Sequence, residues 1–379
     1  MAFINYVTQV QFGLGAVSCI SGECDRLGIR KPLIITDKGV RAAGLVDKVL
    51  SVLDCADDTR IFDETPSNPT EGAVRAAVGM YRSGGHDGII AIGGGSAIDL
   101  SKGTALCATH DGPLSKFAVI EGGMPSITEA VAPVIAVPTT AGTGSEVGRG
   151  AILIMEDGRK LGVLSPYLVP KVAVCDPELT YGLPRQLTAA TGMDAIAHCI
   201  ETFLSPLFNP PADGIALDGL RRGWQNIRKA TDFPNDGDAR LNMMSASMQG
   251  AMAFQKGLGC VHSLSHALGG LDPSLHHGTL NAILLPAVIE FNASSDSVRN
   301  ERKLDRLAEA MGLKEAQSIS AGIRDLSAAL GLPAGLRELG VEVEMFPEII
   351  EGALADHSHK TNPRIATPED YGKILTDSL

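Results

Sequence analysis

The stretch GIIAIGGGSAIDLSKGTAL, residues 88–106, decides the fold of the first half of the chain. Its apolar beginning predicts a buried strand, and its second half predicts a helix. The turn between them contains Gly93, Gly94, Gly95 and Ser96. Glycine lets a backbone approach a diphosphate closely, and the free N–H groups of a helix N-terminus favour an anion. We therefore expect a nucleotide-binding turn here, with Ser96 capping the helix and Asp99 completing a capping box.

Similar apolar runs recur through the first half of the chain. They alternate with amphipathic stretches such as residues 70–84, and this alternation predicts a parallel sheet with helices on its faces. The runs that we interpret as strands are KPLIITD (31–37), RIFDE (60–64), GIIAIGGG (88–95), PVIAVPTT (133–140), AILIMED (151–157) and VAVCD (172–176). The segment FINYVTQVQFG (3–13) is an expected edge strand, which we interpret as a surface for pairing across a homodimer.

The character of the sequence changes around DPELTYGLP (176–184). Long Ala-, Leu- and Met-rich helical patterns follow, and no strand pattern competes with them. We therefore expect two domains: residues 1–182 as an α/β, Rossmann-like dinucleotide-binding domain, and residues 183–379 as an all-helical domain. A ligand cleft between the two is the default expectation for such an arrangement.

Composition excludes several classes of protein. The 379 residues are 44% hydrophobic and 20% charged, as in an ordinary globular protein. A formal net charge of −12 argues against a nucleic-acid partner, because the phosphate backbone needs a basic surface. No apolar run approaches the roughly 20 residues of a membrane span, and the N-terminus lacks the pattern of a signal peptide. The seven cysteines are scattered singly, which indicates reduced thiols in a cytoplasmic protein.

The second half carries a pattern typical of a metal site. Asp194 and His198 stand four residues apart in TGMDAIAHCIE, His262 and His266 stand four apart in CVHSLSHALGG, and the pair HH (276–277) follows. Residues four apart share one face of a helix. Imidazoles with a carboxylate form a typical ligand set for a divalent transition metal. One histidine on an apolar face is more often a hydrogen-bonded core residue, but this combination favours a metal.

Two further features indicate the rest of a nucleotide site. PTTAGTGSEVGRG (138–150) is a second Gly/Thr-rich turn at a strand end, in which Thr139, Thr140 and Thr143 can donate to phosphate or ribose oxygens. Asp37 ends the strand PLIITD, where an acidic side chain accepts from a ribose hydroxyl and repels a 2′-phosphate. This arrangement favours NAD over NADP. The pair of glycines in GTG (142–144) does not have the spacing of the G-x-G-x-x-G fingerprint.

Taken together, these motifs resemble those of one enzyme family. GGGSAIDLSK, PTTAGTGSEV, TGMDAIAHCIE and VHSLSHALGG…HHGTLNAILLP look like the signatures of the iron-containing (group III) alcohol dehydrogenases. The resemblance covers essentially the whole chain in the right order. It implies an NAD-dependent oxidoreductase with one divalent metal, Fe²⁺ by preference and Zn²⁺ or another metal as the alternative. It also implies the two-domain fold expected above, with the active site in the cleft.

The resemblance further implies roles for individual residues. The metal ligands that it implies are Asp194, His198, His262 and His277. His277 follows from matching HG-x-x-N-A, whereas the distance from His262 keeps His276 as the alternative. His266 matches a histidine near the nicotinamide and is the candidate proton relay. The dinucleotide contacts that the resemblance implies are Asp37, Gly93, Gly94, Gly95, Ser96, Thr139, Thr140, Thr143, Lys160 and Leu179.

Segments such as FDETPSNPTE and NPPADGIALDGL resemble the branch of the family that interconverts 4-hydroxybutyrate and succinate semialdehyde. The carboxylate of such a hydroxy acid needs a cationic partner, and arginine suits its bidentate recognition. We expect Arg149, with Lys360, to hold this carboxylate. A surface or interdomain ion pair for Arg149 and a solvated charge for Lys360 are the alternatives.

Other activities stay open at this point. General alkanol or diol dehydrogenases and maleylacetate-type reductases are similar in fold, although the reductases lack the full metal set. Lyases similar to dehydroquinate synthase share the architecture, but they need several Lys or Arg groups for a phosphate or phosphonate, and few stand near the histidine motifs. A metal-binding protein without enzymatic activity would need no dinucleotide turn.

Overall fold

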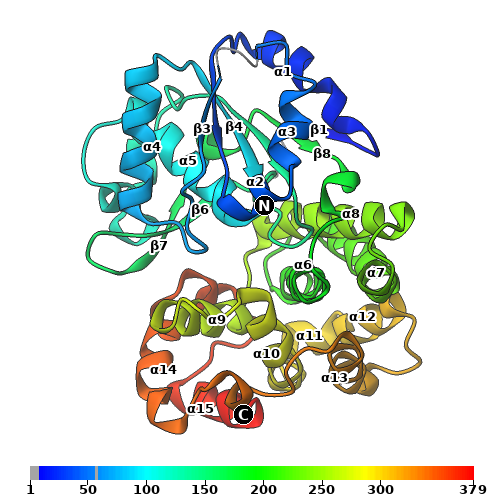
Figure 1. Cartoon of the computed structure of the whole chain (residues 1–379). Coiled ribbons are helices and arrows are strands. Elements are labelled where there is room, and N and C mark those ends of the chain that lie inside the picture. The colour runs from blue at the N-terminus through cyan, green and yellow to red at the C-terminus, as the bar shows by residue number, and fades with distance from the viewer. Residues whose placement is uncertain (1–7, 56–58) are drawn as a thin grey trace. The chain divides into compact units, whose positions relative to one another are not determined.

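The structure, a computed structural model, describes residues 8–55 and 59–379 (Figure 1). The described chain forms two compact units. The sheet unit consists of the described residues before Ala141 together with Ser145–Gly182, and the helical unit consists of Ala141–Gly144 and Leu183–Leu379. The first is built round a parallel sheet and the second is made of helices, which confirms the predicted fold class.

Six parallel strands form the main sheet, in the order β1-β8-β5-β4-β2-β3. Their bounds are β1 Gln9–Phe12, β2 Pro32–Ile35, β3 Arg60–Phe62, β4 Gly88–Gly93, β5 Val134–Pro138 and β8 Val172–Cys175. Five of them match runs that the sequence predicts as strands. β1 is the expected edge strand, and residues 3–7 of that predicted segment lie outside the described residues.

The run AILIMED does not join the main sheet, contrary to the prediction. It forms β6 (Gly150–Ile154), which pairs antiparallel with β7 (Lys160–Leu164) in a separate two-stranded ribbon. The connection between β6 and β7 contains Asp157-Gly158, and Gly158 has a φ of +84°. Asp-Gly is a hairpin signal, and a connection this short cannot cross over to a parallel neighbour.

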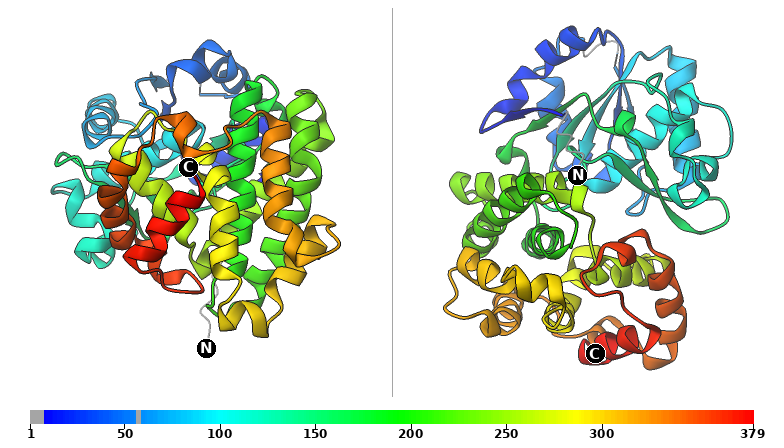
Figure 2. Two further views of the ribbon diagram at one scale, coloured as in Figure 1. Left: turned by 90° about the horizontal axis from the view of Figure 1, so that it is seen from below. Right: turned by 180° about the vertical axis from the view of Figure 1, so that it is seen from behind.

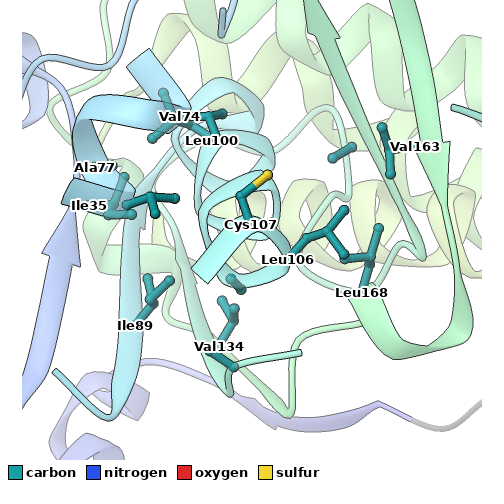
Figure 3. Packing of buried hydrophobic residues seen from close by; sticks show 14 of the residues in the cluster. Ile35, Val74, Ala77, Ile89, Leu100, Leu106, Cys107, Val134, Val163 and Leu168 are labelled. Carbon is teal, nitrogen blue, oxygen red and sulfur yellow. The ribbon is translucent and has the colours of Figure 1, made fainter. Parts of the chain in front are cut away.

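Helices cover both faces of the main sheet, because its strands are apolar on both sides. The helices of this unit are α1 Ile20–Leu27, α2 Lys38–Ala42, α3 Leu45–Leu50, α4 Glu71–Gly84 and α5 Gly95–Thr109. On one face, Ile35 and Ile89 belong to the same buried cluster as Val74 of α4 and Leu106 of α5 (Figure 3). On the other face, alternate residues of the same strands pack with α1 and α3. This alternation holds the carboxyl ends of the strands in register.

The start of α5 differs from the prediction. The helix begins at Gly95, and no side chain caps it. Ser96 Oγ instead donates to Ser67 O at 2.5 Å, and Asp99 accepts from Ser145 Oγ and from a main-chain N–H of β6. The predicted capping box is therefore wrong. Because Gly94 is the residue before the helix, the first N–H groups of α5 receive no side-chain acceptor, which suits an anion.

Residues 183–379, all of them described, contain no strand. Their α-helices are α6 Arg185–Leu204, α7 Pro210–Asp232, α8 Gly237–Met252, α9 Cys260–Leu271, α10 His277–Asn292, α11 Asp296–Asn300, α12 Lys303–Met311, α13 Ile319–Leu330, α14 Phe346–Ala355 and α15 Pro368–Asp377. Helices pack against α6 on several sides (Figure 2), and both α6 and α10 are buried along most of their length. Polar side chains on these two helices are therefore costly unless they are paired. Among the residues that the structure describes, no helix has the length and apolar character that crossing a membrane requires.

Candidate active site

The predicted metal ligands meet inside the helical unit. Asp194 and His198 lie one turn apart on α6, His262 lies on α9, and His277 is the first residue of α10. Asp194 Oδ1 is 3.5 Å from the Nε2 atom of His198, 3.8 Å from that of His262 and 3.6 Å from that of His277. Two ligand atoms at about 2.1 Å from one tetrahedral metal stand about 3.4 Å apart. Each of the three nitrogens thus stands from Asp194 Oδ1 at nearly the spacing of two ligands of one metal, and ligand atoms of Asp194, His198 and His262 all lie within 4.8 Å of one another.

The two buried histidines of the set, His198 and His262, are each held through the ring nitrogen Nδ1. His198 Nδ1 lies 3.3 Å from Gly142 O, and His262 Nδ1 lies 2.6 Å from Glu201 Oε2. Because a carbonyl and a carboxylate only accept, each Nδ1 donates, and each Nε2 has a lone pair whenever its imidazole is neutral. A metal binds histidine through such a lone pair, so this donor set fits a divalent transition metal.

Glu201 is a functional residue that sequence reasoning did not select. It lies two turns after Asp194 on the same face of α6, and its carboxylate also accepts from Val261 N and His262 N at the start of α9. One carboxylate thus orients His262 and satisfies the N–H groups of the helix that carries it. The seven-residue spacing from Asp194 was a signal that would have found it.

The ligand side chains differ in their protonation states. Burial lowers the pKa of His198 to about 4, so this imidazole is neutral at neutral pH. Burial acts in the same direction on His262, but hydrogen bonds to Asp194 and Glu201 outweigh it and raise its pKa to about 9. For Asp194, burial is outweighed by the neighbouring imidazoles, which hold its pKa well below the usual range. A metal ion must therefore displace a proton from His262.

The two candidates for the fourth ligand have different surroundings. His277 faces Asp194, and its side chain is 31% exposed, so the set is open on that side. A catalytic metal must be reached by its substrate, and this exposed side of the set would allow that. His276 is the residue before α10, where its main-chain carbonyl accepts from Thr279 N and Leu280 N. His277 stays the predicted fourth ligand, with His276 as the alternative.

The candidate proton relay lies beside this set. His266 follows His262 by one turn of α9, and its ring stacks on that of His277 with 5.3 Å between centroids and 11° between planes. His266 Nδ1 is 2.9 Å from Asp356 Oδ2, a residue for which the sequence offered no local signal. The carboxylate makes Nδ1 the donor and leaves Nε2 able to accept a proton.

In the sheet unit, most of the predicted dinucleotide residues gather at the carboxyl ends of neighbouring strands. Thr139 N, just after β5, donates to Gly93 O at the end of β4 at 3.0 Å. A Cβ on Gly93 would lie 2.7 Å from Ala97 Cβ and 3.6 Å from Asp37 Oδ2, so only glycine fits there and Asp37 is close by. A Cβ on Gly94 would lie 3.3 Å from Thr140 Oγ1. Ligands of parallel sheets bind at this edge.

Three other predicted dinucleotide residues have different surroundings. Lys160 begins β7, and its Nζ donates to Asn68 Oδ1 at 2.9 Å. Leu179 is 1% exposed and its side chain belongs to the core of the sheet unit, so only its main chain is available to a ligand. Thr143 belongs to the segment that packs with the helical unit. The roles of these residues stay predictions.

The glycines of that segment have a packing role. A Cβ on Gly144, whose φ is +62°, would lie 2.2 Å from Ala251 Cβ, and a Cβ on Gly142 would lie 2.8 Å from Thr191 O. Each glycine therefore lets this segment approach a helix closely, which brings Gly142 O within reach of His198.

The predicted substrate residues Arg149 and Lys360 are both exposed. Arg149 belongs to the sheet unit, and its main-chain carbonyl accepts from Ser165 N. Lys360 belongs to the helical unit, in the 3₁₀ helix η12 (His357–Thr361). Their joint role stays a prediction.

Comparison with known proteins identifies the family of this chain. A family model described as iron-containing alcohol dehydrogenase matches residues 7–177, and the C-terminal model of the Fe-containing alcohol dehydrogenase family matches residues 188–379. The chain belongs to the iron-containing alcohol dehydrogenase family. A curated member, 4-hydroxybutyrate dehydrogenase of Cupriavidus necator, is 60% identical over 383 residues, which cover 100% of both chains.

Solved structures place the family's fold on the whole chain. That of 1,3-propanediol oxidoreductase is 37% identical, with a TM-score of 0.93 and 100% of both chains covered. That of sulfoacetaldehyde reductase from Bifidobacterium kashiwanohense, in complex with NAD⁺, is 26% identical, with a TM-score of 0.90 and coverage of 100% of this chain and 98% of the other.

Proposed function

We propose that this protein is an NAD-dependent, metal-dependent dehydrogenase that interconverts 4-hydroxybutyrate and succinate semialdehyde. The observation that carries the proposal is the convergence of one carboxylate oxygen and three imidazole nitrogens, with the set open at His277. The choice of substrate is supported by the 60% identity to a 4-hydroxybutyrate dehydrogenase. The complete ligand set also argues against a maleylacetate-type reductase.

The four side chains Asp194, His198, His262 and His277 would hold the divalent metal, Fe²⁺ by preference in this family and Zn²⁺ or another ion as the alternative. A divalent ion in such a site supplies Lewis acidity to a substrate oxygen. Glu201 and Gly142 keep two imidazoles in the tautomer that can bind it. Phe254 packs edge-on against His198, with 4.6 Å between ring centroids, and so covers one side of this imidazole.

NAD⁺, when bound, would accept the hydride, and the chain would bind and orient this cofactor. The turn of Gly93, Gly94, Gly95 and Ser96 offers uncapped N–H groups to the diphosphate. Asp37 stands beside Gly93, where its carboxylate is suited to accept from a ribose hydroxyl and to repel a 2′-phosphate.

His266 would take up the alcohol's proton at Nε2, directly or through a hydroxyl or water. Asp356 at Nδ1 would stabilise the imidazolium that results. Arg149, with Lys360, would hold the carboxylate of the hydroxy acid.

We further propose that the enzyme is a cytoplasmic homodimer that binds neither nucleic acid nor membranes. All seven cysteines are free thiols, as a reducing compartment requires. β1 lies at the edge of the main sheet, where Phe12 and Leu14 are 38% and 50% exposed, and such an edge suits pairing with a second copy. Light scattering at several concentrations measures the oligomeric state.

The test of the activity is NADH formation by metal-loaded enzyme with 4-hydroxybutyrate, compared with 1-propanol, 1,2-propanediol and 1,3-propanediol. We expect the highest kcat/KM with 4-hydroxybutyrate. Turnover of the neutral alcohols alone would reject the acid substrate and keep the dehydrogenase. No turnover of any of them would reject both.

A further inference from the structure

A second group of ligand-type side chains lies beside the first in the helical unit. His266 Nδ1 is 2.9 Å and His357 Nδ1 is 3.6 Å from the same oxygen, Asp356 Oδ2. One donor atom from each residue lies within 4.8 Å of the other two. We propose that His266, Asp356 and His357 form a second divalent-metal site, which takes Zn²⁺ or a similar ion and stops turnover when it is filled.

The chain orients the carboxylate of this group. Asp356 Oδ1 accepts from Ser358 N at 2.8 Å, because Asp356 caps η12. Oδ2 is therefore the oxygen that faces the imidazoles. His266 is fixed on α9, and His357 follows Asp356 directly, so the three donors are held by a helix and a capped turn that pack in one unit.

The ion pair between His266 and Asp356 does not account for the position of the His357 side chain. The hydrogen bond between His266 and Asp356 is complete without it. His357 nevertheless stacks on His266, with 5.9 Å between centroids and 21° between planes, and turns its Nδ1 to the oxygen that His266 already uses. At 3.6 Å this contact is too long for a hydrogen bond. It is close to the separation of about 3.4 Å between two ligands of one metal.

Exposure and donor chemistry indicate the kind of ion. The side chains of His266, Asp356 and His357 are 17%, 14% and 44% exposed, so an ion can enter from solvent and keep water as its remaining ligands. Two imidazoles with one carboxylate suit Zn²⁺, Ni²⁺ or Cu²⁺ rather than Mg²⁺ or Ca²⁺. Burial lowers the pKa of His357, which favours its neutral, metal-binding form. With three protein donors in place of four, this site should bind more weakly than the first.

Filling this site would disable His266. An ion on Nδ1 would replace the hydrogen bond to Asp356, the carboxylate that orients this ring, so His266 would no longer be held as the proton relay. The ring of His266 also stacks on His277 of the first set. This inhibitory effect rests on the proposed function, whereas the binding of a second ion does not.

The experiment is equilibrium dialysis of the metal-loaded enzyme against increasing Zn²⁺, with the metal content per chain and the turnover measured on the same samples. The decisive variant is His357→Ala, and the matched control is His359→Ala. His359 lies on the same 3₁₀ helix, but its Nδ1 lies 2.9 Å from Tyr371 Oη. His357→Cys restores a zinc donor at the same position.

We expect two ions per chain in the wild type, with turnover lost as the second binds. His357→Ala should keep its basal turnover, hold one ion, and need at least about tenfold more Zn²⁺ for inhibition. His359→Ala and His357→Cys should behave like the wild type. Replacement of the metal in the first set by Zn²⁺ should affect all variants equally, and it leaves the number of ions per chain unchanged.

Three results would overturn the proposal. A wild type that holds one ion throughout, or a His357→Ala variant with an unchanged second ion, would reject the site. Two ions with undiminished turnover would reject its inhibitory effect. Because the metal count needs no substrate, a failure of the proposed 4-hydroxybutyrate activity stays distinguishable from all three.

Discussion

Asn281 Nδ2 donates a hydrogen bond of 2.7 Å to Asp194 Oδ1, the oxygen around which three imidazoles gather. The same nitrogen is 3.1 Å from His277 Nε2 and 3.3 Å from His262 Nε2. Asn281 is fully buried, and its Oδ1 has no hydrogen-bond partner within the described part of the chain. A carboxylate oxygen has more than one lone pair, so Asn281 and a metal can share Asp194 Oδ1. The side chain that orients Asp194 thus lies within the ligand set itself.

Replacing Asn281 by Ala should lower the affinity for the metal by about 10–100-fold, because Asp194 loses the donor that orients its carboxylate. Metal dissociation into a chelator measures this effect. Asn292→Ala is the matched control: Asn292 is buried on the same helix, but its Nδ2 donates to Asn362 Oδ1 at 3.2 Å. Equal metal affinities of the two variants would contradict the role of Asn281.

Glu201→Gln should weaken metal binding by a similar factor. A glutamine amide satisfies fewer of the three donors that now share the carboxylate, so His262 is no longer held firmly in its metal-binding tautomer. The measurement is metal content after dialysis at low free metal. Glu290→Gln, in an exposed ion pair with Arg324, is expected to leave the content unchanged; full retention of metal by Glu201→Gln would show that the carboxylate is dispensable.

Arg149→Ala should raise KM for 4-hydroxybutyrate by about 10–100-fold and leave KM for 1-propanol unchanged, because a lost charged hydrogen bond costs about 1.5–3 kcal/mol. Steady-state kinetics with both substrates measures this. Arg159→Ala, an exposed arginine paired with Glu121 and Asp157, is the control. An unchanged KM for the acid would remove Arg149 from the substrate site.

Asp37→Ser should increase kcat/KM for NADP⁺ by about tenfold, because a charge that repels the 2′-phosphate is removed. Serine keeps the helix cap, since Asp37 Oδ1 now accepts from Val40 N and a serine hydroxyl caps equally well. Kinetics with both cofactors test this, with Asp47→Ser on α3 as the control. A cofactor preference like that of the wild type would place the selectivity elsewhere.

Glu146 links stability to pH. It is 2% exposed, and burial raises its pKa to about 7, more than the neighbouring Lys102 lowers it. The folded state therefore binds the proton more tightly than the unfolded chain, whose glutamate titrates near 4.3. The stabilisation is complete below about pH 4 and is lost as the pH rises to about 7, on the order of 3–4 kcal/mol.

Glu146→Gln is neutral at every pH and should keep this stability. Urea unfolding at several pH values between 4 and 8 should show the wild type losing stability relative to the variant as the pH rises. Parallel curves for the two proteins would mean that the carboxyl is not buried in this way.

Local patterns of the sequence determined most of the fold class. The strand at 88–92, the glycine turn and the long apolar helices of the second half are read from neighbouring residues, because periodicity and turn chemistry act over a few positions. The same is true of Asp194 with His198 and of the histidine pair on α9, whose four-residue spacing needs only a helix. The hairpin of β6 and β7 also has a local sequence signal, Asp157-Gly158, although the prediction placed the first of these strands in the main sheet.

Only the tertiary structure decided how these elements meet. The contact of Glu201 with His262 spans 61 positions and that of Asp356 with His266 spans 90, and no local rule encodes either. The approach of His277 Nε2 to within 3.6 Å of Asp194 Oδ1 depends on where α10 begins relative to α6, and Ser96 donates to Ser67 O where the prediction made it the cap of α5. The sequence by itself determined which donors are available, since residue type and helical spacing are local. Packing decided which of them share a point, because that depends on the arrangement of whole helices.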